Sequence, residues 1–165
     1  MKIATIIFAA CLLACSALAQ DTDMPAGELP VDPYEMSNDN AGATPLADDA
    51  LFRAFGAEAG ISRIVDEMVE LCLADPRIRD VFMGSDLVRL RRTLKEQFCY
   101  ILGGPCDYTG RDMASSHADH RITTAEFNAL VENLQIAMSK EGVAFRHQNR
   151  LLAKLAPMHR DIVRR

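Results

Sequence analysis

Apolar residues at helical spacing are the feature that most constrains what this chain can fold into. Ahead of Asp75-Pro76 they recur mostly at steps of three and four: Ile61, Ile64, Val65, Met68 and Cys72. This spacing places them on one face of an α-helix, and the proline stops the helix at the residue before it. From Leu51 onward, no stretch alternates apolar and polar residues as a half-buried strand would. The pattern therefore predicts helices that bury one face against each other.

Three more apolar stripes follow, and each has its own start or stop signal. They are Leu87, Leu90, Leu94, Phe98 and Ile101; then Phe127, Leu130, Val131, Leu134 and Met138; and finally Leu151, Leu155, Met158 and Ile162. Asp86 is a capping residue for the first, and Thr123 with Glu126 forms a capping box for the second. Pro157 falls inside the third and should kink it. Together with short pieces between them, these helices predict an all-α domain over residues 50–165.

The charge of the chain is unevenly distributed. Of the 165 residues, the first 49 contain eight acids and one base, whereas the remaining 116 contain 17 bases and 15 acids. The helical part is therefore nearly neutral and lacks the clustered basic residues that a nucleic-acid-binding surface needs. We expect no nucleic-acid partner.

Residues 1–19 are typical of an export signal. Lys2 precedes an apolar run, Ile3–Ala14, that is short for a membrane span, and Ala17-Leu18-Ala19 is a small-x-small cleavage site. Two alternatives are a lipid on Cys15, within a lipoprotein-type site, and an uncleaved anchor. In each case the body of the protein lies outside the cytoplasm, and we expect it in the periplasm. Membrane anchoring requires either the lipid or the retained signal.

Residues 20–49 have the composition of a disordered linker. Four prolines interrupt any helix, and acids, glycine and asparagine fill the intervals. We expect disorder and no catalytic role for this acidic, proline-rich segment. A docking role for its acids is the alternative.

The segment Arg111–Phe127 carries a histidine, His117, on a short helical piece. Met113 lies one turn earlier, and another helix opens at Thr123. A lone histidine is commonly a polar residue of a loop that connects two helices. The alternative is the iron ligand of a haem held between the flanking helices.

Several short motifs occur in a fixed order along the helical part. They are Leu51-Phe52 to Gly56; Ala74-Asp75 to Phe82; Leu102-Gly103-Gly104-Pro105 with Tyr108-Thr109-Gly110-Arg111; Met113, His117, Ile122-Thr123 and Phe127; and Ala156-Pro157-Met158. In order and spacing they resemble the truncated haemoglobins of the first group, which are bacterial-like globins with the two-over-two globin fold. Each motif alone is weak, but together they span Leu51 to Val163 at the family's intervals.

This resemblance implies that His117 is the proximal axial ligand of a haem iron. It implies a pocket lined by Phe82, Met113, Leu90, Leu94, Val69 and Phe127. Because the chain has no Cys-x-x-Cys-His run, we expect haem b held without covalent bonds. Candidates by position for binding its two propionates are Arg91, Arg92, Arg111 and Arg121. His120 is expected at the surface near the haem edge, and with His117 alone it would make a poor zinc site.

The distal half departs from the family's pattern. An ungapped alignment from Leu51 places Val69, Leu90 and Leu94 at the positions of the family's distal tyrosine, histidine and glutamine. The usual hydrogen-bond donors to a bound gas are therefore absent, which predicts an apolar distal pocket with weak O2 retention and easy oxidation of the iron. Thr93 and Gln97 lie near this face and would substitute if the helix were rotated.

Three cysteines follow the export signal. Cys99 ends the distal helix and Cys106 follows a glycine-proline turn, so we predict a disulfide between them in an oxidising compartment. A redox or metal role for this pair has no supporting third or fourth ligand. Cys72 lies on a buried stripe and is expected to be an inert core thiol.

The leading functional hypothesis is an exported haem globin that binds the diatomic gases O2, NO and CO. The alternatives are a haem enzyme for NO dioxygenation or peroxide reduction, and a helical interaction module without haem. An enzyme would need an electron donor, whose identity the sequence does not indicate, and the chain has no flavin or nicotinamide motif. The histidine at the family's spacing argues against the module without haem, and gas binding is favoured over catalysis.

Overall fold

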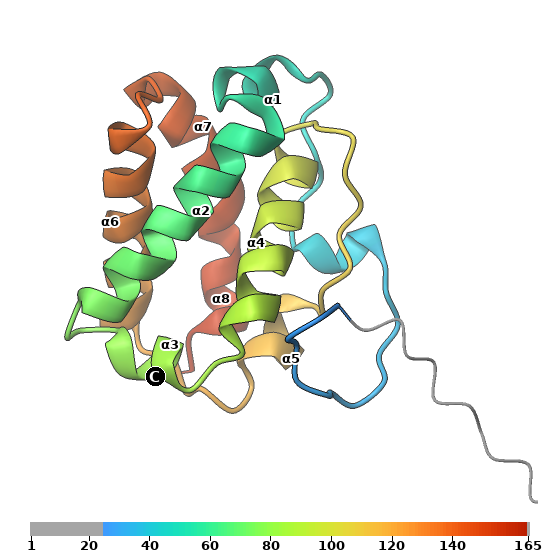
Figure 1. Ribbon diagram of the computed structural model, residues 1–165, viewed down its shortest axis with the longest axis vertical. Coiled ribbons are helices and arrows are strands. Elements are labelled where there is room, and N and C mark those ends of the chain that lie inside the picture. Colours follow the sequence, from blue (N-terminus) through green and yellow to red (C-terminus); the bar gives the residue numbers. More distant parts are fainter. Residues whose placement is uncertain (1–24, 165) are drawn as a thin grey trace, which may run out of the picture.

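A computed structural model of the protein describes residues 25–164. The export signal, with its cleavage site after Ala19 and its alternative at Cys15, lies outside these residues. The elements are η1 (Asn38–Ala41), α1 (Ala50–Ala54), α2 (Ala57–Ala74), α3 (Arg79–Met83), α4 (Leu87–Ile101), α5 (Met113–His117), α6 (Thr124–Lys140), α7 (Phe145–Leu155), η2 (Ala156–Met158) and α8 (His159–Ile162) (Figure 1). No strand occurs in residues 25–164, and the all-α prediction is confirmed.

Local signals in the sequence set the ends of the long helices. The Asp86 carboxylate accepts hydrogen bonds from the backbone N–H groups of Val88 and Arg89 at the start of α4. The predicted capping box at the start of α6 is present in full. Pro157 lacks a backbone N–H, and the last helix accordingly passes from α7 through the 3-10 turn η2 into α8.

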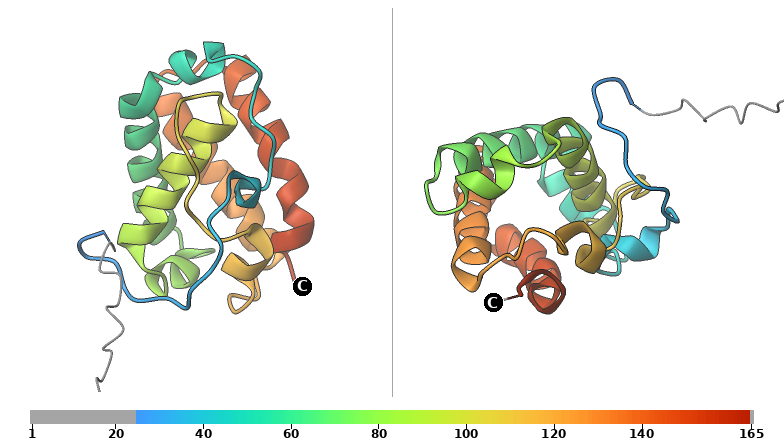
Figure 2. Two further views of the ribbon diagram at one scale, coloured as in Figure 1. Left: turned by 90° about the vertical axis from the view of Figure 1, so that its right-hand side faces the viewer. Right: turned by 90° about the horizontal axis from the view of Figure 1, so that it is seen from below.

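The long helices form two antiparallel pairs. Figure 1 shows α2 running beside α4, and Figure 2 shows this pair lying across a second pair made by α6 and α7 with α8. Helix α2 joins the two layers because it packs against both α4 and α6. This is the two-over-two arrangement that the sequence predicted.

The apolar stripe of α2 forms the centre of the core. Each of its predicted residues is at most 1% exposed: Ile61, Ile64, Val65, Met68 and Cys72. They belong to one cluster with Ile101 of α4, Met138 of α6 and Leu151 of α7. Removal of this apolar surface from water is the main force that holds the layers together.

Residues 25–49 lie against the helical domain, contrary to the prediction of a disordered linker (Figure 2). We call them the N-terminal segment. The Glu28 side chain is 1% exposed, and its carboxylate lies 3.0 Å from Nε of Arg89 and 2.5 Å from Nε of Arg92, both in α4. Ala41 is fully buried. Composition alone suggested disorder because it does not show that the acid has partners some 60 residues further along the chain.

The N-terminal segment also holds the loop between α4 and α5. The Tyr34 hydroxyl donates a hydrogen bond to the Thr109 carbonyl at 2.8 Å. The Arg111 guanidinium donates to the Asp32 carbonyl at 2.8 Å and lies 5.2 Å from the centre of the Tyr34 ring. The segment therefore links α4 to the loop that leads into α5.

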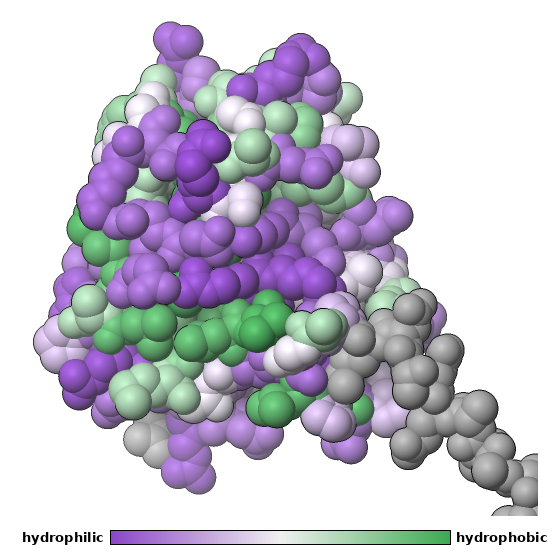
Figure 3. All heavy atoms as spheres, viewed as in Figure 1, coloured by the Kyte–Doolittle hydropathy of each residue, from purple (hydrophilic) through white to green (hydrophobic). Residues whose placement is uncertain are grey.

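The outer face over α2 and α4 is largely hydrophilic across its middle (Figure 3). Ion pairs join the two helices, with Arg91 binding Asp66 and Glu70, and Lys95 also binding Asp66. Within residues 25–164, none of the helices has the length and apolar character needed to span a bilayer.

Candidate functional site

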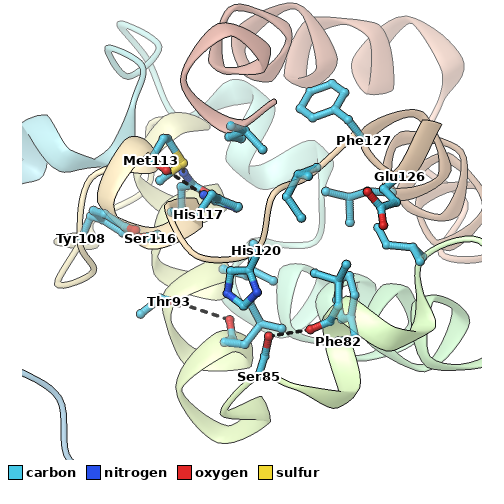
Figure 4. Close-up of a pocket in the computed structure, with 18 residues that line it drawn as sticks. Phe82, Ser85, Thr93, Tyr108, Met113, Ser116, His117, His120, Glu126 and Phe127 are labelled. Atoms are coloured by element: carbon cyan, nitrogen blue, oxygen red, sulfur yellow. Dashed lines mark hydrogen bonds between the residues drawn. The ribbon is translucent and has the colours of Figure 1, made fainter. Parts of the chain in front are cut away.

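A cavity lies between α3 and α4 on one side and α5 and α6 on the other (Figure 4). Its volume is about 170 Å³. Its lining is mostly apolar and includes Ile78, Phe82, Leu90, Leu94, Met113, Ile122, Phe127 and Leu130. Such a lining suits a ligand with a large apolar surface.

Helix α5 brings His117 to the wall of this cavity. Asp112 starts the helix by accepting a hydrogen bond from the backbone N–H of Ser115 at 2.9 Å. One turn later, Nδ1 of His117 lies 2.7 Å from the carbonyl oxygen of Met113, the contact drawn as a dashed line in Figure 4. Because a carbonyl can only accept, Nδ1 carries the proton and Nε2 keeps a lone pair. This is the tautomer in which an imidazole binds a metal through Nε2.

The surroundings of His117 favour its neutral form. Burial has the largest effect and lowers the pKa of the ring, because the charged form would lose its hydration. The hydrogen bond with Met113 raises the pKa, and the nearby charge of His120 lowers it. A neutral ring is the form that binds iron.

The structure brings the predicted pocket residues together, with one exception. Those that share the cavity with His117 are Phe82, Leu90, Leu94, Met113 and Phe127. Val69 does not line the cavity, because its side chain is fully buried in the core. The ungapped alignment gave the position of Val69 along α2. Position along a helix does not show whether other side chains separate that residue from the cavity.

Helix α4 presents a mixed wall, which corrects the prediction of an apolar one. Four residues reach the cavity at the spacing of one helix face: Leu90, Thr93, Leu94 and Gln97. The Thr93 hydroxyl donates to the Arg89 carbonyl at 3.0 Å, and Nε2 of Gln97 donates to the Ala41 carbonyl at 2.8 Å. The Thr93 hydroxyl and one N–H of the Gln97 amide are therefore engaged by backbone oxygens, and Nε2 of Gln97 also lies 3.5 Å from Sδ of Met113. The sequence placed Thr93 and Gln97 near this face, and their steps of three and seven from Leu90 are the spacing of one helix face.

None of the four arginines suggested for the propionates lines the cavity. Arg91 binds Asp66 and Glu70, Arg92 binds Glu28 and Glu96, and Arg111 donates to the Asp32 carbonyl. Arg121 is exposed and lies outside the lining. The lining instead includes the polar residues Ser85, Ser116, His120 and Glu126. Of these, sequence reasoning placed only His120 near this edge.

The cysteines occupy two different environments. Cys99 and Cys106 form a disulfide, with Cα atoms 5.8 Å apart, that fastens the end of α4 to the loop before α5. Cys72 is a free thiol in the core, where burial raises its pKa to about 11. Among residues 25–164, no three His, Cys, Asp or Glu side chains come together to hold a metal ion directly.

Comparison with known proteins identifies relatives of the helical domain. Residues 50–164 match the family model described as bacterial-like globin. A group 1 truncated haemoglobin of Nostoc commune is 29% identical over 108 residues, which are 66% of this chain and 92% of that protein. A group 1 truncated haemoglobin of Tetrahymena thermophila is 27% identical over 94 residues, which are 57% of this chain and 78% of that protein.

Solved structures share the fold. Truncated haemoglobin from Tetrahymena pyriformis, in its Fe(III) form, has a TM-score of 0.66 at 23% identity and covers 70% of this chain and 98% of its own. The 2/2 haemoglobin from a Synechococcus species, solved in the cyanomet state with covalently attached haem, has a TM-score of 0.64 at 22% identity with the same coverage. The helical domain therefore has the two-over-two globin fold.

Proposed function

The chain belongs to the bacterial-like globin family, and we propose that it binds haem b non-covalently with His117 as the proximal ligand of the iron. The observation that carries this proposal is the orientation of the His117 ring. Its Nδ1 donates to the Met113 carbonyl, which leaves the lone pair of Nε2 for a metal beside an apolar cavity. When bound, haem would supply an iron centre able to take up diatomic gases, with His117 as the residue that would hold it.

The chain's own residues suit a flat, apolar cofactor. Phe82 and Leu94 on one side and Phe127 on the other offer apolar surface, and each square ångström of it removed from water contributes about 25 cal/mol. The Met113 carbonyl fixes the tautomer of the ligand and raises its basicity. Binding therefore relies on packing and one oriented histidine, without a covalent bond.

We propose that the physiological ligands are diatomic gases, with NO and CO retained better than O2. A gas that gains negative charge on binding is stabilised by a hydrogen-bond donor in a dry pocket. Thr93 and Gln97 are the donors on the α4 wall, and both already donate to backbone carbonyls. O2 depends most on such a donor, so its retention is expected to be weak.

We also propose that the protein is exported through residues 1–19. The disulfide between Cys99 and Cys106 supports this proposal, because such bonds persist in oxidising compartments such as the periplasm. The mass of the mature protein tests it. Cleavage after Ala19 leaves Gln20 as the first residue, whereas a lipid on Cys15 adds acyl mass to a longer chain.

An absorption spectrum of the purified protein tests haem binding. Haemin is added to the protein, and spectra are recorded before and after dithionite and after CO. We expect a Soret band that shifts at each step, and extraction of the haem into acidified butanone because no covalent bond holds it.

The matched variants are His117→Ala and His147→Ala. His147 lies on α7, outside the cavity lining, and bonds to Arg146. His117→Ala should lose the five-coordinate ferrous spectrum, while His147→Ala should keep it. A parent protein without a Soret band would contradict haem binding, and an unchanged spectrum in His117→Ala would contradict the ligand assignment.

A further inference from the structure

The proposed cofactor brings two carboxylates into a cavity that offers few partners for them. Carboxylates are held best by N–H donors that can carry a positive charge. No lysine or arginine of residues 25–164 lines the cavity. Its titratable lining residues are Tyr108, His117, His120 and Glu126.

Three of these four residues already have other partners or roles. His117 donates through Nδ1 to Met113 and is the proposed iron ligand. Tyr108 is 5% exposed, and its hydroxyl donates to the Arg111 carbonyl at 2.9 Å. Glu126 is an acid and closes the capping box at the start of α6. Of the four, His120 is the residue whose ring makes no hydrogen bond to other side chains or backbone groups of residues 25–164, so its N–H can donate to a ligand.

The neutral hydroxyls of the lining do not replace His120. Ser85 donates to the Val81 carbonyl at 2.9 Å, and Thr93 donates to the Arg89 carbonyl at 3.0 Å. Ser116 offers a hydroxyl without charge. A carboxylate that reaches this rim therefore finds a ring N–H donor in His120.

His120 is also placed where a solvated carboxylate would lie. It is exposed and yet lines the cavity, so it stands at the mouth. Figure 4 shows its ring on the loop after α5, facing Ser85 and Thr93 across the opening. The backbone N–H of His120 donates to the His117 carbonyl at 3.2 Å. This bond ties the rim residue to the same turn as the proposed iron ligand.

We propose that His120 binds a haem carboxylate at the mouth of the cavity. The carboxylate edge of the haem would then face water at this mouth. This inference rests on the proposed function and adds to it a residue that recognises the polar edge of the cofactor. It also explains how a cavity that none of the four candidate arginines lines can receive an anionic group.

Two forms of the cofactor separate this role from simple packing. The dissociation rate of haemin is measured by transfer to an excess of an apo-globin acceptor, and the measurement is repeated with haemin dimethyl ester, whose carboxylates are blocked. The proteins are the parent, His120→Ala, His120→Arg and the control His147→Ala.

We expect His120→Ala to release haemin about three to ten times faster than the parent, the loss of one solvent-exposed, charge-assisted hydrogen bond. With the dimethyl ester the two proteins should release at the same rate. His120→Arg should restore slow release of haemin, and His147→Ala should match the parent for both forms.

Two results would overturn the inference while haem binding stands. One is an unchanged haemin release rate in His120→Ala, and the other is an equal acceleration with haemin and with its ester, which would mean that His120 acts by packing. A parent that binds neither form would instead contradict the proposed function, and this inference with it. Circular dichroism confirms that each variant is folded.

Discussion

At the scale of single residues, the wall formed by α4 has donors that are already in use. Nε2 of Gln97 is bonded to the Ala41 carbonyl, in a part of the N-terminal segment that is fully buried. Leaving a buried acceptor without a partner costs about 1–3 kcal/mol. Gln97 therefore stays with Ala41, and although the wall is mixed, its donors already have partners in the protein.

Leu94→Gln should add the donor that this wall does not offer. Leu94 lines the cavity. A glutamine at this position would bring amide N–H groups that are not already bonded to a backbone oxygen. A new hydrogen bond of about 1–2 kcal/mol would slow O2 dissociation by about five- to thirtyfold. Stopped-flow displacement of O2 measures the rate, and CO release should change much less. Leu94→Met controls for packing, and equal O2 release rates in all three proteins would show that residue 94 does not face the gas.

Several cavity-lining residues could be predicted from sequence, but the polar partners could not. His117, Met113, Phe82 and Phe127 followed from motifs at fixed spacing, and all four line the cavity. Their positions depend on local helix geometry, which spacing records. The sequence could not choose among the four candidate arginines, because a guanidinium can bind any acid within its reach, and Arg92 binds Glu28 from 64 residues away. Contacts of that kind leave no local pattern.

At the scale of elements, the helices were predictable and the N-terminal segment was not. Caps at Asp86 and Thr123 and the break at Pro157 act through neighbours in sequence, and each is found where it was expected. The N-terminal segment has no periodic apolar stripe, so it resembled a linker. What holds it is a buried acid between two arginines of α4, together with hydrogen bonds to the loop before α5.

Glu28→Gln should loosen the N-terminal segment and change its response to pH. The hydrogen bond from Arg92, the largest effect, and that from Arg89 lower the pKa of Glu28, against the opposing effect of burial. A carboxyl whose pKa is lowered on folding stabilises the protein above its ordinary pKa of 4.5, and this contribution disappears as the pH falls through the lowered value. At pH 7 the free energy that opposes opening of this segment should be about 1–3 kcal/mol lower in the variant than in the parent. The difference from the parent should diminish as the pH falls through the lowered pKa of Glu28.

Hydrogen exchange of peptides from residues 25–42, followed from pH 7 to pH 3, measures this effect. Glu35→Gln is the matched control, because Glu35 is an exposed acid of the same segment. Equal protection of parent and Glu28→Gln at pH 7 would show that the buried pair does not hold the segment in place.

Breaking the disulfide between Cys99 and Cys106 should destabilise the connection from α4 to α5. The bond closes a short loop, and its loss is expected to lower the free energy of unfolding by about 2–3 kcal/mol. Urea unfolding of a Cys99→Ala/Cys106→Ala variant measures the loss. Alkylation under denaturing conditions should label one cysteine of the mature protein before reduction and three after it. Three labelled cysteines before reduction would contradict the bond.

At the scale of the whole molecule, the cavity lies where the two helix layers meet. It is lined by Leu94 of α4 from one layer and by Phe127 of α6 and Ile162 of α8 from the other. Helix α2, which joins the layers through the core, does not contribute to the lining. A ligand in the cavity therefore makes contacts between layers that the protein alone does not have, and its binding must stabilise the fold as a unit.

Haem should accordingly raise the unfolding temperature of the entire domain. A ligand at one hundred times its dissociation constant stabilises the folded state by about 2.7 kcal/mol, which corresponds to roughly 10 °C for a domain of this size. Differential scanning calorimetry with and without haemin measures the shift, and His117→Ala should show a much smaller one. Glu28→Gln should unfold earlier with and without haemin but keep the full shift, because Glu28 does not line the cavity and the two contributions add. A shift that depended on Glu28 as strongly as on His117 would mean that the N-terminal segment, and not the cavity between the layers, determines how haem is held.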